Sequence, residues 1–80
     1  MDLKKLAIHL YSIDDVRRFV TAACSQVFDV DIVTGRYIVD AKSIMGLFSL
    51  DLSKPIFVEA HGTEEEVAEF FESLKEFVPK

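Results

Sequence analysis

The chain of 80 residues carries a formal net charge of −5, and half of its residues are hydrophobic. A chain of this length buries only about 60% of the surface that it exposes when unfolded, which allows one domain with a modest core and excludes a second. The acidic balance is unfavourable for binding nucleic acid and favours a basic partner surface. Residues 1–80 are therefore expected to form a single domain.

The apolar stretch over residues 6–11 is interrupted by His9 and followed by acidic residues. It is too short and too polar for a signal peptide or a membrane span, so we expect a cytoplasmic protein that does not contact a membrane. Cys24 is the only cysteine, which excludes an internal disulfide. Because it lies in a helical pattern beside two alanines, we expect a buried, inert thiol.

A strand and a helix are expected in the first third of the chain. Apolar and more polar residues alternate over residues 3–9, the period-two pattern of a half-buried strand, and His9 lies inside this pattern. Ser12 then begins a helix to about residue 26, because its hydroxyl oxygen can accept the backbone N–H of Asp15. The residues expected to face the core are Leu6, Ile8 and Leu10 of the strand and Val16, Val20, Ala23 and Val27 of the helix.

A hairpin and a short second helix are expected next. The pair Thr34-Gly35 supplies a tight turn between a strand near residues 28–32 and a strand over residues 36–39. Ser43 then begins a helix through Leu50, which has more apolar residues than one narrow stripe can bury. In the first strand Phe28, Val30 and Ile32 should face the core and Asp29 and Asp31 the solvent, and in the helix Leu47 and Leu50 should face the core.

The last third of the chain predicts a strand and a third helix. Pro55 cannot donate to a strand ladder and suits the first position of a strand that ends at Gly62. Thr63 and Glu66 are spaced as a capping box, and Pro79 stops the helix. The apolar face of this helix comprises Val67, Phe70, Phe71, Leu74 and Val78.

The element order β-α-β-β-α-β-α predicts an α+β fold. Its expected form is a two-layer open-faced sandwich, in which three helices cover one face of a four-stranded, mostly antiparallel sheet. The segment Ala41-Lys42-Ser43-Ile44-Met45-Gly46-Leu47-Phe48-Ser49-Leu50, taken together with this order, resembles the HPr family, the phosphocarrier proteins of the bacterial sugar phosphotransferase system. The resemblance covers nearly the whole chain. It also aligns Phe19 and Val20 with an apolar pair of the family without a gap.

The same gapless register places Ser12 where the family has its phosphorylated histidine, with Asp14 and Asp15 where an arginine and a proline usually follow. A serine phosphoester has a much lower transfer potential than a phosphoramidate, so a phosphorylated Ser12 would be an end state. We therefore interpret Ser12 as a helix cap. His9, three positions away but inside the strand pattern, is the alternative acceptor.

Ser43 keeps the surroundings of a second family site. In HPr of many Gram-positive bacteria the matching serine is phosphorylated by an ATP-dependent kinase, so the resemblance implies a regulatory phosphosite at Ser43, with a helix cap as the alternative role. The resemblance also implies a surface on the first and second helices that contacts protein partners. Ile44, Met45 and Phe48 match its apolar residues, and we expect Ile13 and Arg17 of the first helix to extend it.

The leading hypothesis is an HPr-like binding or regulatory module without carrier activity, either a monomer or a weak dimer. Its implied partners are phosphotransferase-system proteins, HPr kinase or a transcriptional regulator. The alternatives are a working phosphocarrier that uses His9 and a small structural or dimerisation domain. The chain has no Gly-rich phosphate loop and no nucleophile with a base in register, so we predict no enzyme activity and no cofactor.

A metal site on the outer face of the sheet is also not expected. The polar residues predicted there alternate along strands without a cysteine pair or a His-x-x-x-His spacing, which is typical of a solvated face. These residues are Lys5, His9, Asp29, Asp31, Asp40, Glu59 and His61.

Overall fold

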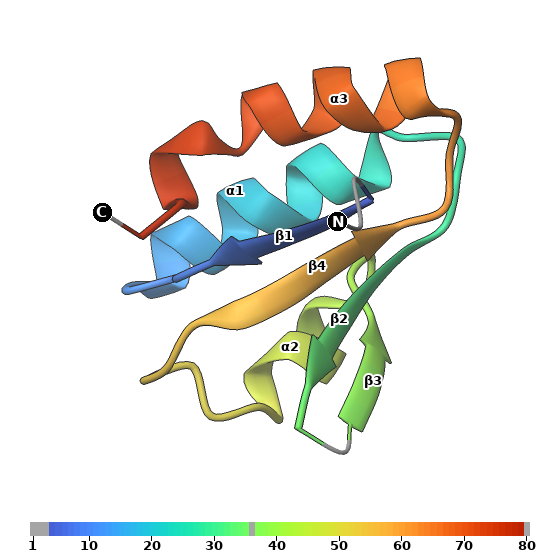
Figure 1. Ribbon diagram of the computed structural model, residues 1–80. Coiled ribbons are helices and arrows are strands. Elements are labelled where there is room, and N and C mark those ends of the chain that lie inside the picture. The colour runs from blue at the N-terminus through green and yellow to red at the C-terminus, as the bar shows by residue number, and fades with distance from the viewer. Residues whose placement is uncertain (1–3, 36, 80) are drawn as a thin grey trace.

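The computed structural model describes residues 4–35 and 37–79, which form a sheet with helices packed on one of its faces (Figure 1). The strands lie in the order β1-β4-β2-β3, and each strand pair found among the described residues is antiparallel. In chain order the elements are β1 (Lys5–Ile8), α1 (Ile13–Cys24), β2 (Val30–Thr34), β3 (Tyr37–Asp40), α2 (Ile44–Phe48), β4 (Ile56–Ala60), α3 (Glu64–Ser73) and a 3₁₀ helix (Lys75–Phe77). The predicted two-layer α+β sandwich is confirmed.

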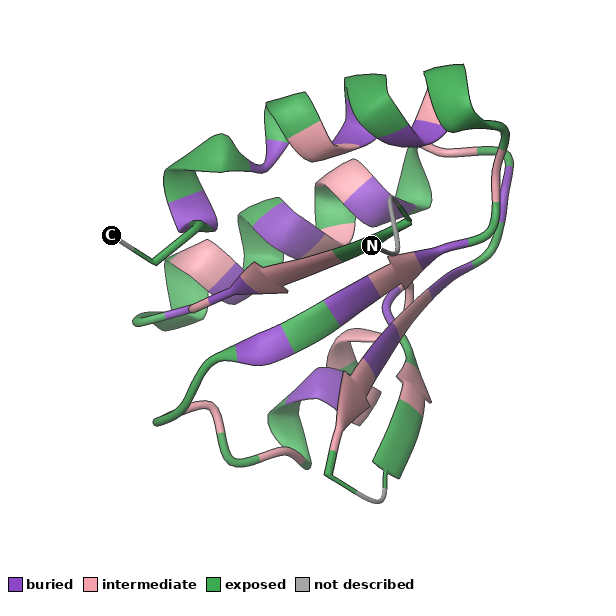
Figure 2. Ribbon diagram, viewed as in Figure 1, coloured by how far each residue is buried: buried purple, intermediate pink, exposed green. Residues whose placement is uncertain are grey.

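The period-two pattern of the strands separates a buried row of side chains from an outward one. Val58 of β4 lies opposite Leu6 of β1 on one side and Ile32 of β2 on the other. Figure 2 shows that along β4 buried residues alternate with exposed or intermediate ones. The face that carries Val58 and Ile32 is therefore the one that the helices cover.

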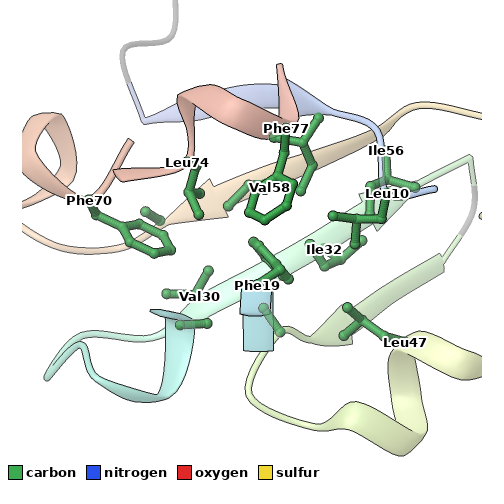
Figure 3. Close-up of a cluster of buried hydrophobic side chains, with 14 of the residues drawn as sticks. Leu10, Phe19, Val30, Ile32, Leu47, Ile56, Val58, Phe70, Leu74 and Phe77 are labelled. Atoms are coloured by element: carbon green, nitrogen blue, oxygen red, sulfur yellow. The ribbon is translucent and has the colours of Figure 1, made fainter. Parts of the chain in front are cut away.

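The core lies between this face and the helices (Figure 3). Phe19 of α1, Leu47 of α2 and Phe70 of α3 each bring a large buried side chain to it. The rings of Phe28 and Phe70 meet edge to face, with centroids 5.8 Å apart. Burial of such a side chain contributes roughly 1.5–3 kcal/mol, so these residues hold the three helices on the sheet.

Helix α1 ends earlier than the sequence predicts, at Cys24 instead of Gln26. Val27 therefore lies beyond the helix and is 92% exposed, while Phe28 turns inward to pack on Phe70. The expectation that Cys24 is buried is wrong as well. Ala23 occupies the buried position of this turn, and the exposed Cys24 thiol donates to the backbone oxygen of Lys42 at 3.5 Å.

Helix α3 begins as the sequence predicts. The Thr63 hydroxyl oxygen accepts the Glu66 N–H at 3.2 Å, and the Glu66 carboxylate accepts the Thr63 N–H at 2.9 Å, which completes a capping box. The helix ends at Ser73 and a 3₁₀ helix follows it. This tighter helix turns Phe77 into the core and leaves Val78 exposed, although the helical spacing predicts a buried Val78.

The remaining strands and helices also begin or end at other residues than predicted, at the points where strand pairing or helix capping stops. β1 ends at Ile8, before His9. Residue 3 of the predicted first strand and residue 36 of the predicted strand over 36–39 lie outside the described residues. Helix α2 ends at Phe48, so Leu50 follows it and packs against the core only partly buried. In the β2–β3 turn Gly35 has a φ of +54°, a conformation that glycine adopts without strain. No helix in the described part of the chain has both the length and the apolar character needed to cross a membrane.

The two glycines at 46 and 62 give a matched test of packing. A Cβ added to Gly62 would lie 2.7 Å from Cδ2 of Phe28, whereas a Cβ on Gly46 would lie 3.5 Å from the Ser43 Oγ, an ordinary contact. We expect Gly62→Ala to lower the free energy of unfolding by about 1–3 kcal/mol, because the Phe28 ring must move. Gly46→Ala should leave it unchanged or raise it by up to about 1 kcal/mol. Urea unfolding of both variants measures this, and equal stability of the two would contradict it.

Candidate functional site

The start of helix α1 is the first part of the candidate site. Ser12 is its N-cap, as predicted, with extended backbone and a hydroxyl oxygen that accepts the Asp15 N–H at 3.0 Å. The Asp15 carboxylate reaches back and accepts the Tyr11 N–H at 2.9 Å. A hydroxyl and a carboxylate of the chain itself therefore already occupy the place where a helix N-terminus attracts an anion.

The Asp15 carboxylate is held mainly in its charged form. The hydrogen bond from the Tyr11 N–H is the largest influence on its pKa and lowers it below the ordinary value of 3.8. Burial opposes this shift, and the hydrogen bond and charge of the Arg18 guanidinium lower the pKa further. Hydrogen bonds to a carboxylate favour the ionised form. Asp15 is thus negatively charged at neutral pH.

Arg18 is committed to carboxylates of its own chain. Its Nε lies 3.1 Å from Asp14 Oδ2, one NH2 lies 2.7 Å from Asp15 Oδ1, and the other bonds to Glu76. Its Cζ is also 5.5 Å from the centroid of the Phe77 ring. Arg18 thus pairs with Asp14 at the i,i+4 spacing of a helix, and through Glu76 this guanidinium ties the 3₁₀ helix to α1.

His9 does not lie inside a strand, which corrects the sequence-based expectation. β1 ends at Ile8, and the His9 N–H donates to the backbone oxygen of Phe77 at 2.8 Å. The imidazole stacks on the Tyr11 ring, with centroids 4.0 Å apart. Because the backbone of His9 bonds to Phe77 instead of to a neighbouring strand, its imidazole lies at the start of α1.

A groove of about 430 Å³ joins the start of α1 to the end of α2. It contains both Ser12 and His9, the two acceptor candidates, and it brings together Ile13 and Phe48 of the predicted partner surface. The residues that line it are His9, Leu10, Tyr11, Ser12, Ile13, Val16, Phe48, Leu52 and Ser53.

Ser43 caps helix α2 in the same way that Ser12 caps α1. Its hydroxyl oxygen accepts the Gly46 N–H at 3.2 Å, and its own N–H donates to the backbone oxygen of Asp40 at 3.0 Å. The side chain is half-buried, and no acidic residue lies in the first turn of the helix. The two caps thus differ in their electrostatic surroundings, since acids follow only Ser12.

The residues of the predicted partner surface lie at the solvent-facing sides of α1 and α2. Met45 is 76% exposed, Phe48 is 46% exposed, and Ile13 and Arg17 are exposed as well. Ile44 is partly buried and packs against the core. Four of the five residues are therefore available to a partner, and we call Ile13, Arg17, Met45 and Phe48 the helical surface.

Two residues that line the groove, Tyr11 and Ser53, are not among the site residues that the sequence predicts. Tyr11 is exposed beside His9, and no periodicity singles out a residue between a strand and a helix. Ser53 donates its N–H and its hydroxyl to Asp51 at 3.0 and 2.6 Å, which lowers the pKa of Asp51. The sequence does contain a signal for this turn, because an aspartate often accepts the backbone N–H two residues further on, as the Asp-x-Ser spacing allows.

On the opposite face of the sheet His61 is paired. Its Nε2 lies 2.9 Å from Asp31 Oδ2, and the two line a hollow of about 450 Å³ together with Asp29 and Asp40. Over residues 4–35 and 37–79, no three histidine, cysteine or acidic side chains are grouped as metal ligands. His9, expected on this face, lies instead in the groove.

Solved structures of phosphocarrier proteins share this architecture. A protein named HPr-C-His from Thermoanaerobacter tengcongensis is 23% identical with a TM-score of 0.72, and the match covers 90% of this chain and 91% of that one. HPr from Bacillus anthracis str. Ames is 24% identical with a TM-score of 0.71, over 94% and 95% of the two chains. The histidine-containing phosphocarrier protein of a Mycoplasma is 15% identical with a TM-score of 0.71, over 90% and 88%.

These likenesses show that the chain has the HPr fold. No protein-family model matches the sequence, and no curated protein matches it. The shared feature is therefore the arrangement of the sheet and helices, which the alternation of buried residues and the helix caps produce in this chain.

The Asp15 carboxylate should make the stability of the protein depend on pH. Because its pKa is lowered on folding, it stabilises the native state above pH 3.8, and this stabilisation is lost as the pH falls through the lowered pKa. We expect Asp15→Asn to cost roughly 1 kcal/mol at pH 7 and less at pH 3. Asp14→Asn, which removes an exposed carboxylate bound to Arg18, should cost less at pH 7. Urea unfolding at both pH values measures this, and a pH-independent effect of Asp15→Asn would contradict it.

Proposed function

We propose that this protein is an HPr-like docking and regulatory module related to the sugar phosphotransferase system, and that it does not carry phosphate at the start of α1. The HPr fold over most of the chain supports the relation. The observation that carries the proposal is the start of α1, where Ser12 and Asp15 already accept backbone N–H groups. By the resemblance, this is where a carrier would have its phosphorylated histidine.

The charges near Ser12 oppose a phosphate there. At a separation of about 5 Å and an effective dielectric constant near 20, a phosphate meets about 3 kcal/mol of repulsion for each unit charge of Asp14 or Asp15. Arg18 is the nearby cation with a suitable position, and it already bonds to both of these carboxylates and to Glu76. A phosphoester at Ser12 would also be a poor donor for onward transfer. Ser12 therefore acts as a cap in this proposal.

Ser43 is the proposed regulatory phosphosite. The first turn of α2 contains no acid, and the Asp40 side chain three residues earlier accepts the Lys42 N–H at 2.9 Å. A phosphate on Ser43 would add about −1.5 to −2 charges at pH 7 beside Met45 of the helical surface. Such a charge changes the affinity of an apolar surface for its partners, which is the regulation that we propose.

The helical surface is the proposed contact for protein partners. Ile13 and Phe48 line the groove between α1 and α2, and the exposed Met45 lies on the same short helix as Phe48. Methionine and aromatic residues are enriched in the cores of protein interfaces. Arg17 supplies a positive charge one turn further along α1. The proposed partners are phosphotransferase-system proteins, with HPr kinase or a transcriptional regulator as the regulatory ones.

Phosphorylation assays with two enzymes test the non-carrier proposal. We expect HPr kinase and ATP to add one phosphate, located on Ser43 by peptide mass spectrometry, to the wild type and to Ser12→Ala but not to Ser43→Ala. Enzyme I and phosphoenolpyruvate should add none, since by the resemblance Ser12 stands at the position of the carrier histidine. Circular dichroism of both serine variants confirms that each remains folded. Phosphate added by neither enzyme would remove the regulatory part of the proposal, and acid-labile phosphate from enzyme I would contradict its non-carrier part.

The position of His9 favours a second candidate function, a working phosphocarrier. Its imidazole lies in the same groove as Ser12 and outside the sheet. In this case enzyme I and phosphoenolpyruvate should produce acid-labile phosphate on the wild type and on His61→Gln, but none on His9→Gln. His61 is the matched control because it lies on the opposite face of the sheet, paired with Asp31. Acid-labile phosphate that persists in His9→Gln would exclude this candidate.

A further inference from the structure

The uncovered face of the sheet carries a continuous apolar row that the helices do not reach. Strand pairing places Ala7 opposite Phe57, Phe57 opposite Val33, and Val33 opposite Ile38. Each strand thus contributes one residue, in the order β1-β4-β2-β3. Phe57 is 46% and Ile38 is 68% exposed. An apolar row across a whole sheet face is unusual for a surface that only contacts water.

The next outward row on this face is mostly acidic. Lys5 lies opposite Glu59, Glu59 opposite Asp31, and Asp31 opposite Asp40. Lys5, at the β1 end, lies 4.0 Å from Glu59 and 5.8 Å from the centroid of the Phe57 ring. Negative charge is therefore concentrated toward β2 and β3, beside Val33 and Ile38 of the apolar row.

Asp31 and Asp40 carry like charges directly opposite each other on neighbouring strands. Such a pair destabilises a sheet. Asp31 Oδ2 already lies 2.9 Å from His61 Nε2, and Asp40 Oδ1 accepts the Lys42 N–H. A lysine or arginine side chain placed between the two carboxylates would add the positive charge that relieves their repulsion. The pair borders the hollow that His61 and Asp29 complete. Its chemistry complements a lysine or arginine, while the adjoining row complements an apolar side chain.

We propose that this open sheet face, formed by the apolar row Ala7, Phe57, Val33 and Ile38 with Asp31 and Asp40 beside it, binds a segment of a partner protein that presents apolar side chains next to lysine or arginine. The acidic row and the net charge of −5 disfavour the phosphates of a nucleic acid. They also disfavour a second copy of the chain, which would bring the same acidic row. This inference concerns the face opposite the helical surface and does not rest on the proposed function.

Two short synthetic peptides of equal length serve as probes, one alternating leucine with arginine and the other leucine with glutamate. Backbone amide shifts of the ¹⁵N-labelled full chain should move for Ile38, Phe57 and Asp31 on addition of the arginine peptide, and not for Met45. Binding should weaken as salt is added. The glutamate peptide should not bind.

Variants that keep the fold locate the charge that is recognised. Asp31→Asn and Asp40→Asn should each weaken binding of the arginine peptide by up to about fivefold, the factor expected for one exposed ion pair. Asp14→Asn makes the same charge change on α1 and should leave binding unchanged. Ile38→Ser, on an edge strand, should weaken binding through the loss of apolar contact.

Other results of the peptide experiment would contradict the proposal. Shifts confined to the groove between α1 and α2, equal binding of the two peptides, or binding of neither would overturn the inference. Sedimentation of the free protein at several concentrations provides a further check. A dimer that Ile38→Ser or Phe57→Ser dissociates would show that a second copy covers this face, which would also overturn it.

Discussion

The pairing of β4 with both β1 and β2 is the constraint on which both surfaces of this protein depend. The register that sets Val58 between Leu6 and Ile32 buries Val58 and Ile32 under the helices, packs the partly buried Leu6 against them, and turns Phe57 and Glu59 outward. A slip of one residue would exchange the two faces. The packing of the core therefore determines which residues line the open sheet face. It also determines the sheet face on which α1 and α2 pack and form their groove.

The start of α1 shows how capping and phosphate binding compete for the same backbone groups. A helix N-terminus offers unpaired N–H donors and a favourable field for anions. Here the Ser12 hydroxyl accepts one such donor, the Asp15 N–H, while the Asp15 carboxylate accepts the Tyr11 N–H just before the cap and places a negative charge there. Arg18 bonds to this carboxylate. The cap therefore uses a donor that a phosphate would need, and Asp15 adds a charge that repels it. Helix α2 is also capped by a serine, Ser43, but its first turn contains no acid. A phosphate at this helix start would not meet the repulsion that it meets at Ser12.

The fold and the helix caps could be predicted from the sequence because they follow from local chemistry. Period-two alternation identified the buried Val30 and Ile32, and Ser12, Ser43 and Thr63 all cap helices as their spacing predicts. The errors at Cys24, Val27 and Val78 arise where a helix ends, since the rotation of a side chain there depends on tertiary packing. His9 was misplaced for a similar reason, because its backbone pairs with Phe77, a residue distant in the chain. Local patterns do not contain that contact.

Asp40 links the charge of the open sheet face to the start of α2. Asp40 belongs to the acidic row on the open face, and its backbone oxygen accepts the N–H of Ser43 at 3.0 Å. Charges act over about 8 Å at physiological ionic strength. A phosphate on Ser43 would therefore make the β3 end of the acidic row more negative while it adds charge beside Met45. One modification would thus change the two surfaces in opposite senses, weakening apolar docking on α2 and strengthening attraction of a basic segment to the open sheet face.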